Sequence, residues 1–180
     1  MKILVLLFAA LLVAGCGEKS SSDSPEPLIH DADVERLLKE AVDFDSLEER
    51  EGLAYQPNES EPYSGWAKSM YDSGQVKGLG QFKDGKEDGL KTIWHENGQK
   101  QVEGTYKDDK QDGLSTGWHE NGQKGFEIIL KDGKYEGLFT RWHGNDQKWF
   151  EVTHKDGEEV SAKYWNSKGE EVETQEEAWK

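Results

Sequence analysis

The sequence predicts a mainly-β fold: an elongated single-layer antiparallel meander of repeated β-hairpins, with one amphipathic helix near the N-terminus. Three observations lead to this prediction. A motif recurs every 24 residues, and each copy opens on a glycine: Gly65, Gly89, Gly113 and Gly137. Within each copy, apolar and polar residues alternate with the period of a β-strand. Asn-Gly and Asp-Gly pairs separate the alternating runs, and such pairs are typical of tight hairpin turns.

The motif is clearest at residues 89–112, which read GLKTIWHENGQKQVEGTYKDDKQD. The remaining copies are residues 65–88, 113–136, 137–160 and a partial, shortened copy at 161–172. Divergent terminal copies are typical of repeat arrays, because an end repeat has a neighbour on one side only. We therefore expect a repeat domain over residues 53–172 with about two strands in each copy.

The second copy shows how a repeat is built. Leu90, Thr92 and Trp94 alternate with the residues between them, and the run stops before an Asn-Gly pair that we interpret as a type I′ turn. A second run follows and ends at another tight turn, so no connection is long enough for a crossover helix. The residues expected to form turns are Asn97, Gly98, Asn121, Gly122, Asp132 and Gly133.

The pattern G-x-x-x-x-W-(H/Y/D)-E-N-G-Q-K, followed by Y-K-D-G-K-x-D-G, resembles the MORN-type repeat. It is most similar to the bacterial variant found in proteins labelled YwqK-family antitoxins. The resemblance covers residues 63–170. It implies a MORN-like sheet and a non-enzymatic antitoxin or immunity role, in which the sheet sequesters a toxin.

Residues 1–15 have the features of a secretory signal peptide: a basic start, a short apolar run and a small-residue end. The apolar run is short for a transmembrane helix, which is the alternative. Val13-Ala14-Gly15-Cys16 resembles a bacterial lipobox, and the resemblance implies a lipoprotein acylated on Cys16, with palmitate among the chains. We expect export and lipid anchoring to the bacterial cell envelope, at the outer membrane because Gly17 rather than Asp follows the cysteine.

The remaining segments flank the repeats. We expect a flexible tether over residues 16–30, an amphipathic helix over residues 31–50, a short strand at Leu53–Tyr55, and a tail over residues 173–180 with a helical turn after Thr174. The residues expected on the apolar face of the helix are Val34, Leu37, Leu38, Ala41, Val42 and Leu47.

Charge and composition exclude several functions. The net charge of −15 argues against nucleic acid and against a basic patch for anionic lipid. The sequence has no Ser or Cys nucleophile paired with a plausible base and no phosphate-binding glycine loop, so we expect neither an enzyme nor a cofactor. Cys16 is the single cysteine, which excludes a disulfide within the chain.

Two groups of residues suggest metal binding. His95, His119 and His143 occupy one position in three repeats, but equivalent positions lie two strands, about 10 Å, apart. Zinc holds its nitrogens at about 2.1 Å, so we expect no shared ion and place the histidines beside the turns. The acids around the Asp-Gly turns, such as Asp132 and Glu136, suggest calcium, but turn chemistry accounts for them.

Aromatic and aliphatic residues recur at fixed positions in the repeats, and we expect them to share one face of the sheet. The helix would cover about three repeats, so this face is either fully buried or open to a partner over the C-terminal repeats. The candidate partner-binding residues are Trp118, Phe126, Leu138, Trp142 and Phe150. The residues that occupy one position in successive repeats form four rows: Trp66/Leu90/Leu114/Leu138, Met70/Trp94/Trp118/Trp142, Gly78/Val102/Phe126/Phe150 and Phe82/Tyr106/Leu130/His154.

Two functions remain open. One is a monomeric scaffold that binds a protein partner, for which the resemblance suggests a toxin. The alternative is a lipoprotein that binds cell-wall glycan, because residues 63–68, YSGWAK, resemble the G-W-x-K openings of cell-wall-binding repeats. The later repeats begin with Gly-Leu instead of Gly-Trp, which weakens the second resemblance.

Overall fold

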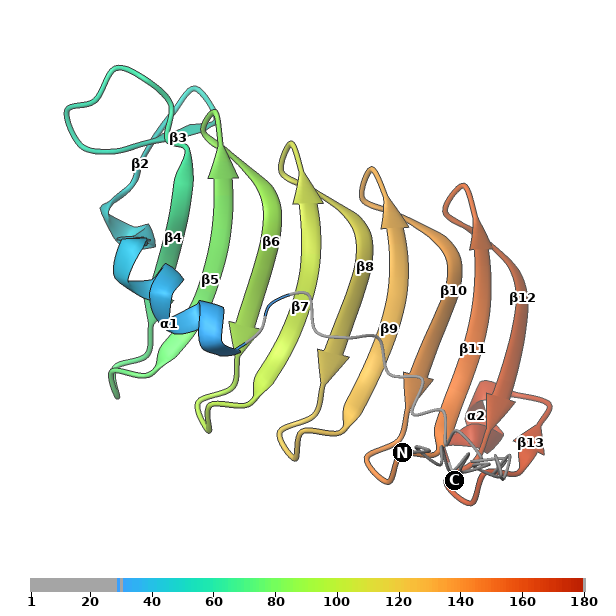
Figure 1. The fold of residues 1–180 in the computed structure, drawn as a ribbon. Coiled ribbons are helices and arrows are strands. Elements are labelled where there is room, and N and C mark those ends of the chain that lie inside the picture. The colour runs from blue at the N-terminus through green and yellow to red at the C-terminus, as the bar shows by residue number, and fades with distance from the viewer. Residues whose placement is uncertain (1–28, 30, 180) are drawn as a thin grey trace, which may run out of the picture.

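The computed structural model describes Ile29 and residues 31–179. The expected signal peptide, Cys16 and all but the end of the expected tether lie outside the described residues. Within them, the chain forms one long, twisted sheet with a short helix on one face near its beginning (Figure 1). No helix in the described part of the chain has the length and apolar character needed to cross a membrane.

The main sheet contains eleven strands, which follow chain order except at its first edge: β1-β4-β5-β6-β7-β8-β9-β10-β11-β12-β13. All neighbours are antiparallel apart from β1 and β4. The predicted meander is therefore confirmed. The strands are β1 Val42–Asp43, β4 Gly65–Met70, β5 Val76–Lys83, β6 Lys86–Trp94, β7 Lys100–Lys107, β8 Lys110–Trp118, β9 Lys124–Lys131, β10 Lys134–Trp142, β11 Lys148–Lys155, β12 Glu158–Trp165 and β13 Glu171–Val172.

The Asn-Gly turn differs in type from the prediction. Gly98 has a φ of 84°, but Asn97 does not have a positive φ, and Gly98 N–H donates to His95 O at 2.9 Å. The Asn-Gly pair is therefore not a type I′ turn; it closes a type I turn whose next residue is left-handed. The type I′ geometry occurs at the two-residue Asp-Gly turns, where Asp132 has φ 49° and Gly133 has φ 79°. Loop length decides between the types, because a two-residue loop needs the I′ twist.

The glycines that open the second, third and fourth repeats lie in β-bulges. Phe82 pairs with Glu87 and Gly80 pairs with Lys91, so β6 has two more residues than β5 between these pairs. Gly89 has a φ of 119° within this bulge, and a Cβ there would overlap the side chain of Gln81. From the second repeat onward, the 24-residue glycine period thus marks a bend in β6, β8 and β10.

The N-terminal helix is shorter than predicted. Helix α1 spans Asp31–Glu40 and is followed by β1, a 3₁₀ turn at Phe44–Ser46, and the hairpin of β2 (Glu48–Arg50) and β3 (Leu53–Tyr55). The helix ends because β-branched Val42 pairs with Ala67 and extends the edge of the sheet. Val42 and Leu47 accordingly pack near Tyr63 and Phe82 and not on the helix. The predicted strand at Leu53–Tyr55 is confirmed.

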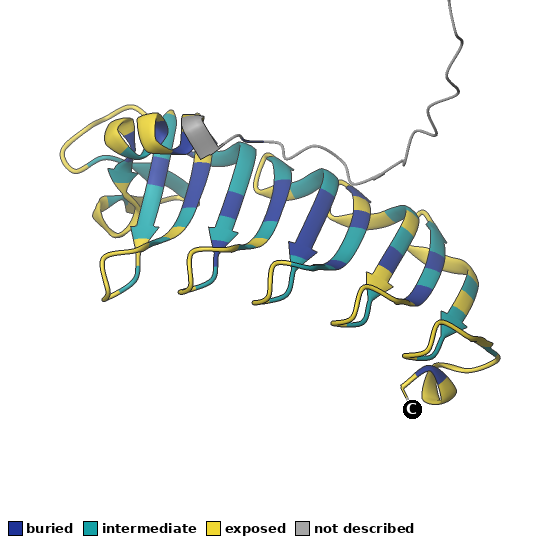
Figure 2. Cartoon of the chain, turned by 60° about the horizontal axis from the view of Figure 1, so that its bottom comes forward, coloured by how far each residue is buried: buried dark blue, intermediate teal, exposed yellow. Residues whose placement is uncertain are grey.

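Helix α1 packs on one face of β4–β6. Its buried residues Val34 and Leu37, with Ala41 directly after the helix, join Leu79 and Trp94 in one cluster. Burial is concentrated in the middle of the strands (Figure 2). Ile29 belongs to the same cluster with 5% of its surface exposed, so the expected tether ends earlier than residue 30.

The C-terminal end is capped by a second helix. Helix α2 spans Gln175–Ala178, and the Thr174 hydroxyl accepts a hydrogen bond from Glu177 N–H at 3.3 Å. Ala178 is fully buried against Trp149 and Phe150. The predicted helical turn after Thr174 is confirmed.

Candidate binding surface

The register of the strands places the rows of recurring apolar residues on two different faces of the sheet. Residues directly opposite each other in neighbouring strands point to the same side. Thr92 lies opposite Glu103, whereas Ile93 lies opposite Val102. The row of Leu90, Thr92 and Trp94 therefore lies on the face that carries α1, and the Val102 row lies on the other face.

The expectation of one shared apolar face is wrong for this reason. Among the candidate binding residues, Trp118, Leu138 and Trp142 lie on the α1 side, which we call the tryptophan face. Phe126 and Phe150 lie on the opposite side, which we call the phenylalanine face. Sorting residues by apolar character missed this division, because the pairing across the turn, and not the residue type, sets the side.

The phenylalanine face packs against itself. The ring centroids of Phe126 and Phe139 are 6.4 Å apart, and those of Phe139 and Phe150 are 5.0 Å apart; both pairs pack edge to face. Gly117 lies opposite Phe126, and a Cβ at Gly117 would overlap its ring. At the C-terminal end, Trp149 lies 4.7 Å from Trp179 beside α2. Phe126 and Phe150 therefore contribute to packing within the sheet.

The middle of the tryptophan face is a polar row that crosses the strands. Threonine and glutamate alternate along it: Thr92, Glu103, Thr116, Glu127, Thr140 and Glu151. Each glutamate pairs with the lysine three residues before it, at 2.6 Å for Lys100–Glu103, 2.8 Å for Lys124–Glu127 and 2.5 Å for Lys148–Glu151. These ion pairs were not among the predictions, although K-x-x-E recurs at one position in three repeats and is a readable signal.

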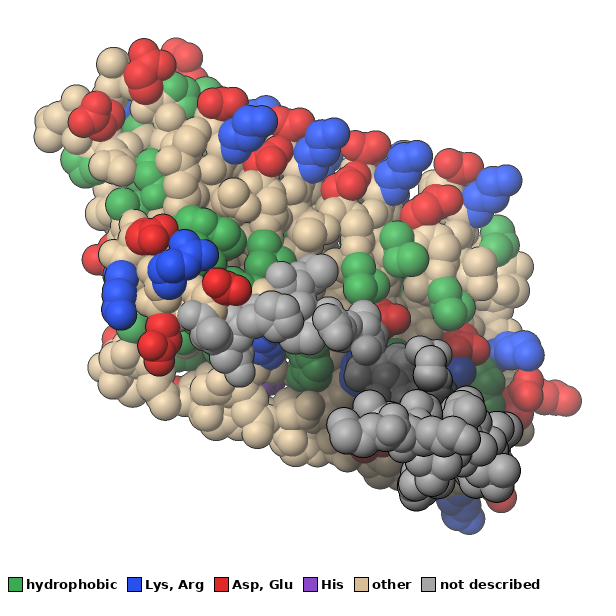
Figure 3. All heavy atoms as spheres, in the orientation of Figure 1, with side chains coloured by type: hydrophobic (Ala, Val, Ile, Leu, Met, Phe, Trp, Pro, Cys, Tyr) green, Lys and Arg blue, Asp and Glu red, His purple; other side chains and the backbone are tan. Residues whose placement is uncertain are grey.

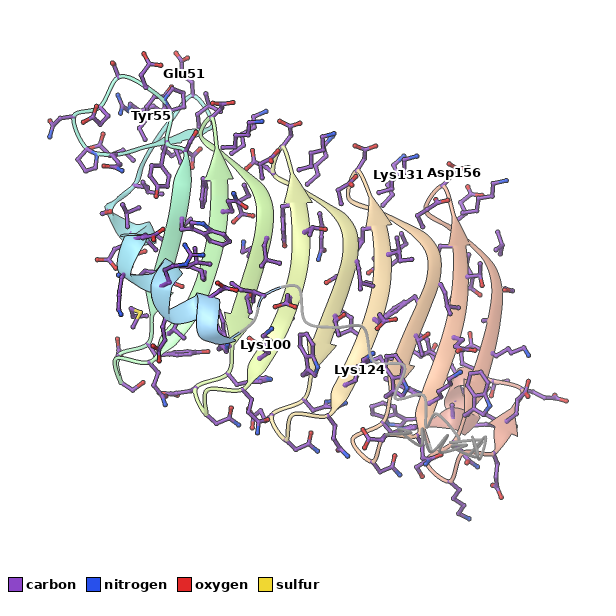
Figure 4. All side chains as sticks on the ribbon, viewed as in Figure 1. Glu51, Tyr55, Lys100, Lys124, Lys131 and Asp156 are labelled. Carbon is purple, nitrogen blue, oxygen red and sulfur yellow. The ribbon has the colours of Figure 1, made fainter. Side chains whose placement is uncertain are left out.

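Beside this row, lysines and tryptophans alternate. Lys100 lies 6.0 Å from the Trp118 ring centre, Lys124 lies 5.2 Å from Trp142, and Lys148 lies 5.5 Å from Trp165. Lys100 and Lys124 occupy equivalent places in neighbouring repeats (Figure 4). Each lysine therefore joins a carboxylate of its own strand to an aromatic ring of the next repeat.

On the other side of the polar row lies an aliphatic row. Leu114 is directly opposite Ile129, and Leu138 occupies the position in β10 that Leu114 has in β8. Ile129 and Leu138 are unusually exposed for large apolar residues, at 45% and 46%, and Val160 in β12, where the pairing with β11 is irregular, is 60% exposed. Green hydrophobic side chains are visible along this part of the surface (Figure 3).

Exposure on the tryptophan face rises with distance from α1. Trp94, at the position predicted to lie under the helix, is 5% exposed, whereas Trp142 is half-buried. The Lys100 side chain is 15% exposed and the equivalent Lys148 side chain 46%. Helix α1 thus covers the first repeat and the start of the second, and the surface over residues 113–160 is the open part of this face within the described residues.

The histidines connect neighbouring repeats. Nε2 of His95 lies 3.0 Å from Trp118 O, Nε2 of His143 lies 3.2 Å from Trp165 O, and His119 makes a longer contact of the same kind. Because a carbonyl oxygen only accepts, each imidazole donates from Nε2. The described residues contain no group of three side chains placed to hold a metal ion.

The turn residues also link one repeat to the next. Asn97 Nδ2 donates to Glu120 O at 2.7 Å, while its Oδ1 accepts from Gln99 N–H. At the other edge, Asp112 Oδ2 accepts from Asp132 N–H at 3.0 Å, and Glu136 Oε2 accepts from Asp156 N–H at 2.9 Å. These acids, considered above for calcium, serve as acceptors for backbone donors of the next turn.

The geometry defines the chain as a β-hairpin repeat protein with one packed face and one partly open face. Residues 87–108 match the family model described as MORN repeat variant, which corresponds to β6, β7 and the start of the following turn. MORN repeats are typically scaffolds that bind proteins or membranes. No curated protein and no solved structure matches the chain.

Proposed function

We propose that this chain is a non-enzymatic, membrane-anchored scaffold that binds a protein partner through the tryptophan face over residues 113–160. The observation that supports the proposal is the exposure of Ile129 and Leu138 on the same face as the half-buried Trp142, from which the polar row separates them. Exposed apolar side chains gathered on one face typically mark an interaction site. Aromatic side chains are enriched at the centres of such sites.

A more specific role follows from the sequence resemblance, and we propose it on that basis. A YwqK-like antitoxin or immunity protein would hold a toxin on this face. An acylated Cys16 would place the sheet outside the cytosol, so the toxin would be an incoming or periplasmic protein. The acid-rich chain, with its net charge of −15, favours a cationic partner.

The anchoring part of the proposal is tested by Cys16→Ser, with Ser21→Ala as the control in the same segment. Several acyl chains on one residue give stable membrane attachment, so we expect the cysteine variant to fractionate as a soluble protein. The control should remain with the membranes. Membrane association of Cys16→Ser would show that the sheet or α1 binds lipid and would reject the anchor.

Partner binding is tested by affinity capture with the full chain from envelope extracts of the cells that make it. We expect a specific protein to be captured by the wild-type chain and lost when Leu138 is replaced by Glu. Binding to purified peptidoglycan in place of a protein would support the glycan alternative. Against that alternative, Trp66, which carries the resemblance to cell-wall repeats, packs against the α1 cluster.

A further inference from the structure

The tryptophan face over residues 113–160 has a more specific chemistry, and we propose that it binds a basic amphipathic helix of the partner protein. This inference rests on the proposed function, because it names the kind of segment that the proposed binding face accepts. Three observations carry it: a helix already seated on the same face, an open aliphatic row that continues from that seat, and carboxylates along the middle of the open part.

Helix α1 shows how this face receives a helix. Its buried residues Val34 and Leu37 belong to the cluster that contains Leu79 and Trp94. Lysines of the sheet donate to backbone oxygens at both ends of the segment: Lys68 Nζ to Leu38 O at 2.8 Å, and Lys100 Nζ to Ile29 O at 3.1 Å. The helix runs across the strands, from β6 toward β4 (Figure 1).

The same surface continues beyond the N-terminal end of α1. Leu90, which packs against α1, has its equivalents in Leu114 and in Leu138, which is 46% exposed. Lys124 and Lys148 repeat the position of Lys100. The five strands β8–β12 span about 19 Å at roughly 4.8 Å per strand. A helix of about 13 residues, at 1.5 Å per residue, matches that length.

The open part of the tryptophan face differs from the part under α1 in its middle row. In the middle row, the surface under α1 carries Leu79, whereas Glu127 and Glu151 occupy the equivalent positions in the later repeats. Their side chains keep 30% and 23% of their surface exposed. Each carboxylate has two oxygens, and its lysine contacts one of them, so the other can accept from an incoming cation. A helix with lysines or arginines beside its apolar stripe therefore fits better than a second acidic helix such as α1.

Residues 17–28 precede α1 in the chain, but their sequence, GEKSSSDSPEPL, has no apolar residues at helical spacing. They do not have the composition of the proposed occupant. A separate protein segment that combines leucine-like residues with cations does. The overall negative charge would also accelerate its association at low salt.

The experiment compares two substitutions in β10 with the same charge change on opposite faces. Leu138 is 46% exposed on the tryptophan face, and Tyr135 is 44% exposed on the phenylalanine face, where it contacts Phe139. The probe is the 14-residue peptide LKKLLKLLKKLLKL, titrated by fluorescence anisotropy into the full chain. The peptide LEELLELLEELLEL is the charge-reversed control probe.

We expect the basic peptide to bind the wild-type chain and to lose about tenfold or more in affinity with L138E, as loss of a central apolar contact predicts. L138E adds a negative charge, so attraction by charge alone would strengthen binding. Y135E should change affinity by less than about twofold, and the acidic peptide should not bind. Ile129→Glu is a second variant of the row, and far-UV circular dichroism checks that each variant folds.

Equal binding to wild type and L138E, equal loss with Y135E, or equal binding of both peptides would overturn the proposal. A change in the oligomeric state of L138E without a change in peptide affinity would assign the row to self-association, and the proposal would again fail. The proposed function has its own outcome: a native protein captured by wild type and Y135E but lost with L138E, while the basic peptide binds wild type and L138E equally, would keep partner binding on the tryptophan face and reject a basic helix as its occupant.

Discussion

Truncation of two tryptophans in equivalent positions separates the packed part of the tryptophan face from its open part. Trp94 is 5% exposed under α1, and Trp142 is half-buried two repeats later, with Lys124 5.2 Å from its ring centre. Trp94→Ala and Trp142→Ala therefore make the same chemical change in two environments, and each serves as the control for the other.

The magnitude follows from buried area. A tryptophan side chain buries about 150–250 Å² when fully covered. At about 25 cal/mol per Å², this contributes about 4–6 kcal/mol. Observed costs of truncating a core tryptophan to alanine are about 3–5 kcal/mol, which we expect for Trp94. Trp142 is only partly buried, and we expect a smaller loss of about 2–3 kcal/mol for it.

Thermal unfolding followed by far-UV circular dichroism measures the difference without relying on tryptophan emission. For a chain of this size, 1 kcal/mol shifts the Tm by about 2–4 °C. We expect Trp94→Ala to lower the Tm by about 10 °C or more and Trp142→Ala by about 5 °C. Partner or peptide affinity should show the opposite order, with the larger loss for Trp142→Ala.

Equal and large losses of stability at both sites would refute this reasoning. The tryptophan row would then be core along its whole length, covered in solution beyond the segment that α1 reaches. A larger stability loss at Trp142 than at Trp94 would contradict the placement of α1 itself.

Three further predictions concern two glycines of the repeats and the buried Tyr63. Gly133→Ala should cost about 1–2 kcal/mol in the free energy of unfolding, because Gly133 has a φ of 79°. Gly144→Ala is the control in denaturant titrations and should be nearly neutral, because Gly144 has no left-handed φ and no atom lies within 4 Å of the new Cβ. Gly117→Ala should cost about 1–3 kcal/mol by overlap with Phe126, and Gly117→Ala combined with Phe126→Leu should recover part of it. Burial raises the pKa of the Tyr63 phenol above its usual value, so the neutral phenol's contribution to the free energy of unfolding is present below about pH 10 and is lost as the pH rises through the raised pKa. Tyr63→Phe should reduce the fall of stability with alkaline pH, and an unchanged dependence of stability on pH would argue against burial of the phenol.

Much of the architecture was readable from local sequence. The 24-residue glycine period, the alternation within each run and the short connections together require an antiparallel meander, because each signal restricts the backbone independently. Leu53–Tyr55 and the helical turn after Thr174 were also correct, since both depend on short-range patterns. The burial of Trp94 followed from its distance to the N-terminal helix.

The remaining features depend on contacts that sequence periodicity does not encode. The end of α1 is set by Val42 pairing with Ala67, a contact between distant residues. The division into two faces is set by the pairing of Ile93 with Val102 across the turn. The turn type depends on the number of loop residues, and Asn-Gly suits more than one type. The lysine–glutamate pairs were missed because charged residues were assumed to lie on a solvated face.

Site-specific photo-cross-linking in the cells that make the protein tests the central claim most directly. A benzophenone amino acid placed at Leu138 reports on the tryptophan face, and the same group at Tyr135 reports on the phenylalanine face of the same strand, at nearly equal exposure. We predict that irradiation joins a single protein to the chain from position 138 and not from position 135. A cross-link from position 135 alone, equal cross-links from both positions, or no protein cross-link from either would contradict a scaffold that binds its partner on the tryptophan face.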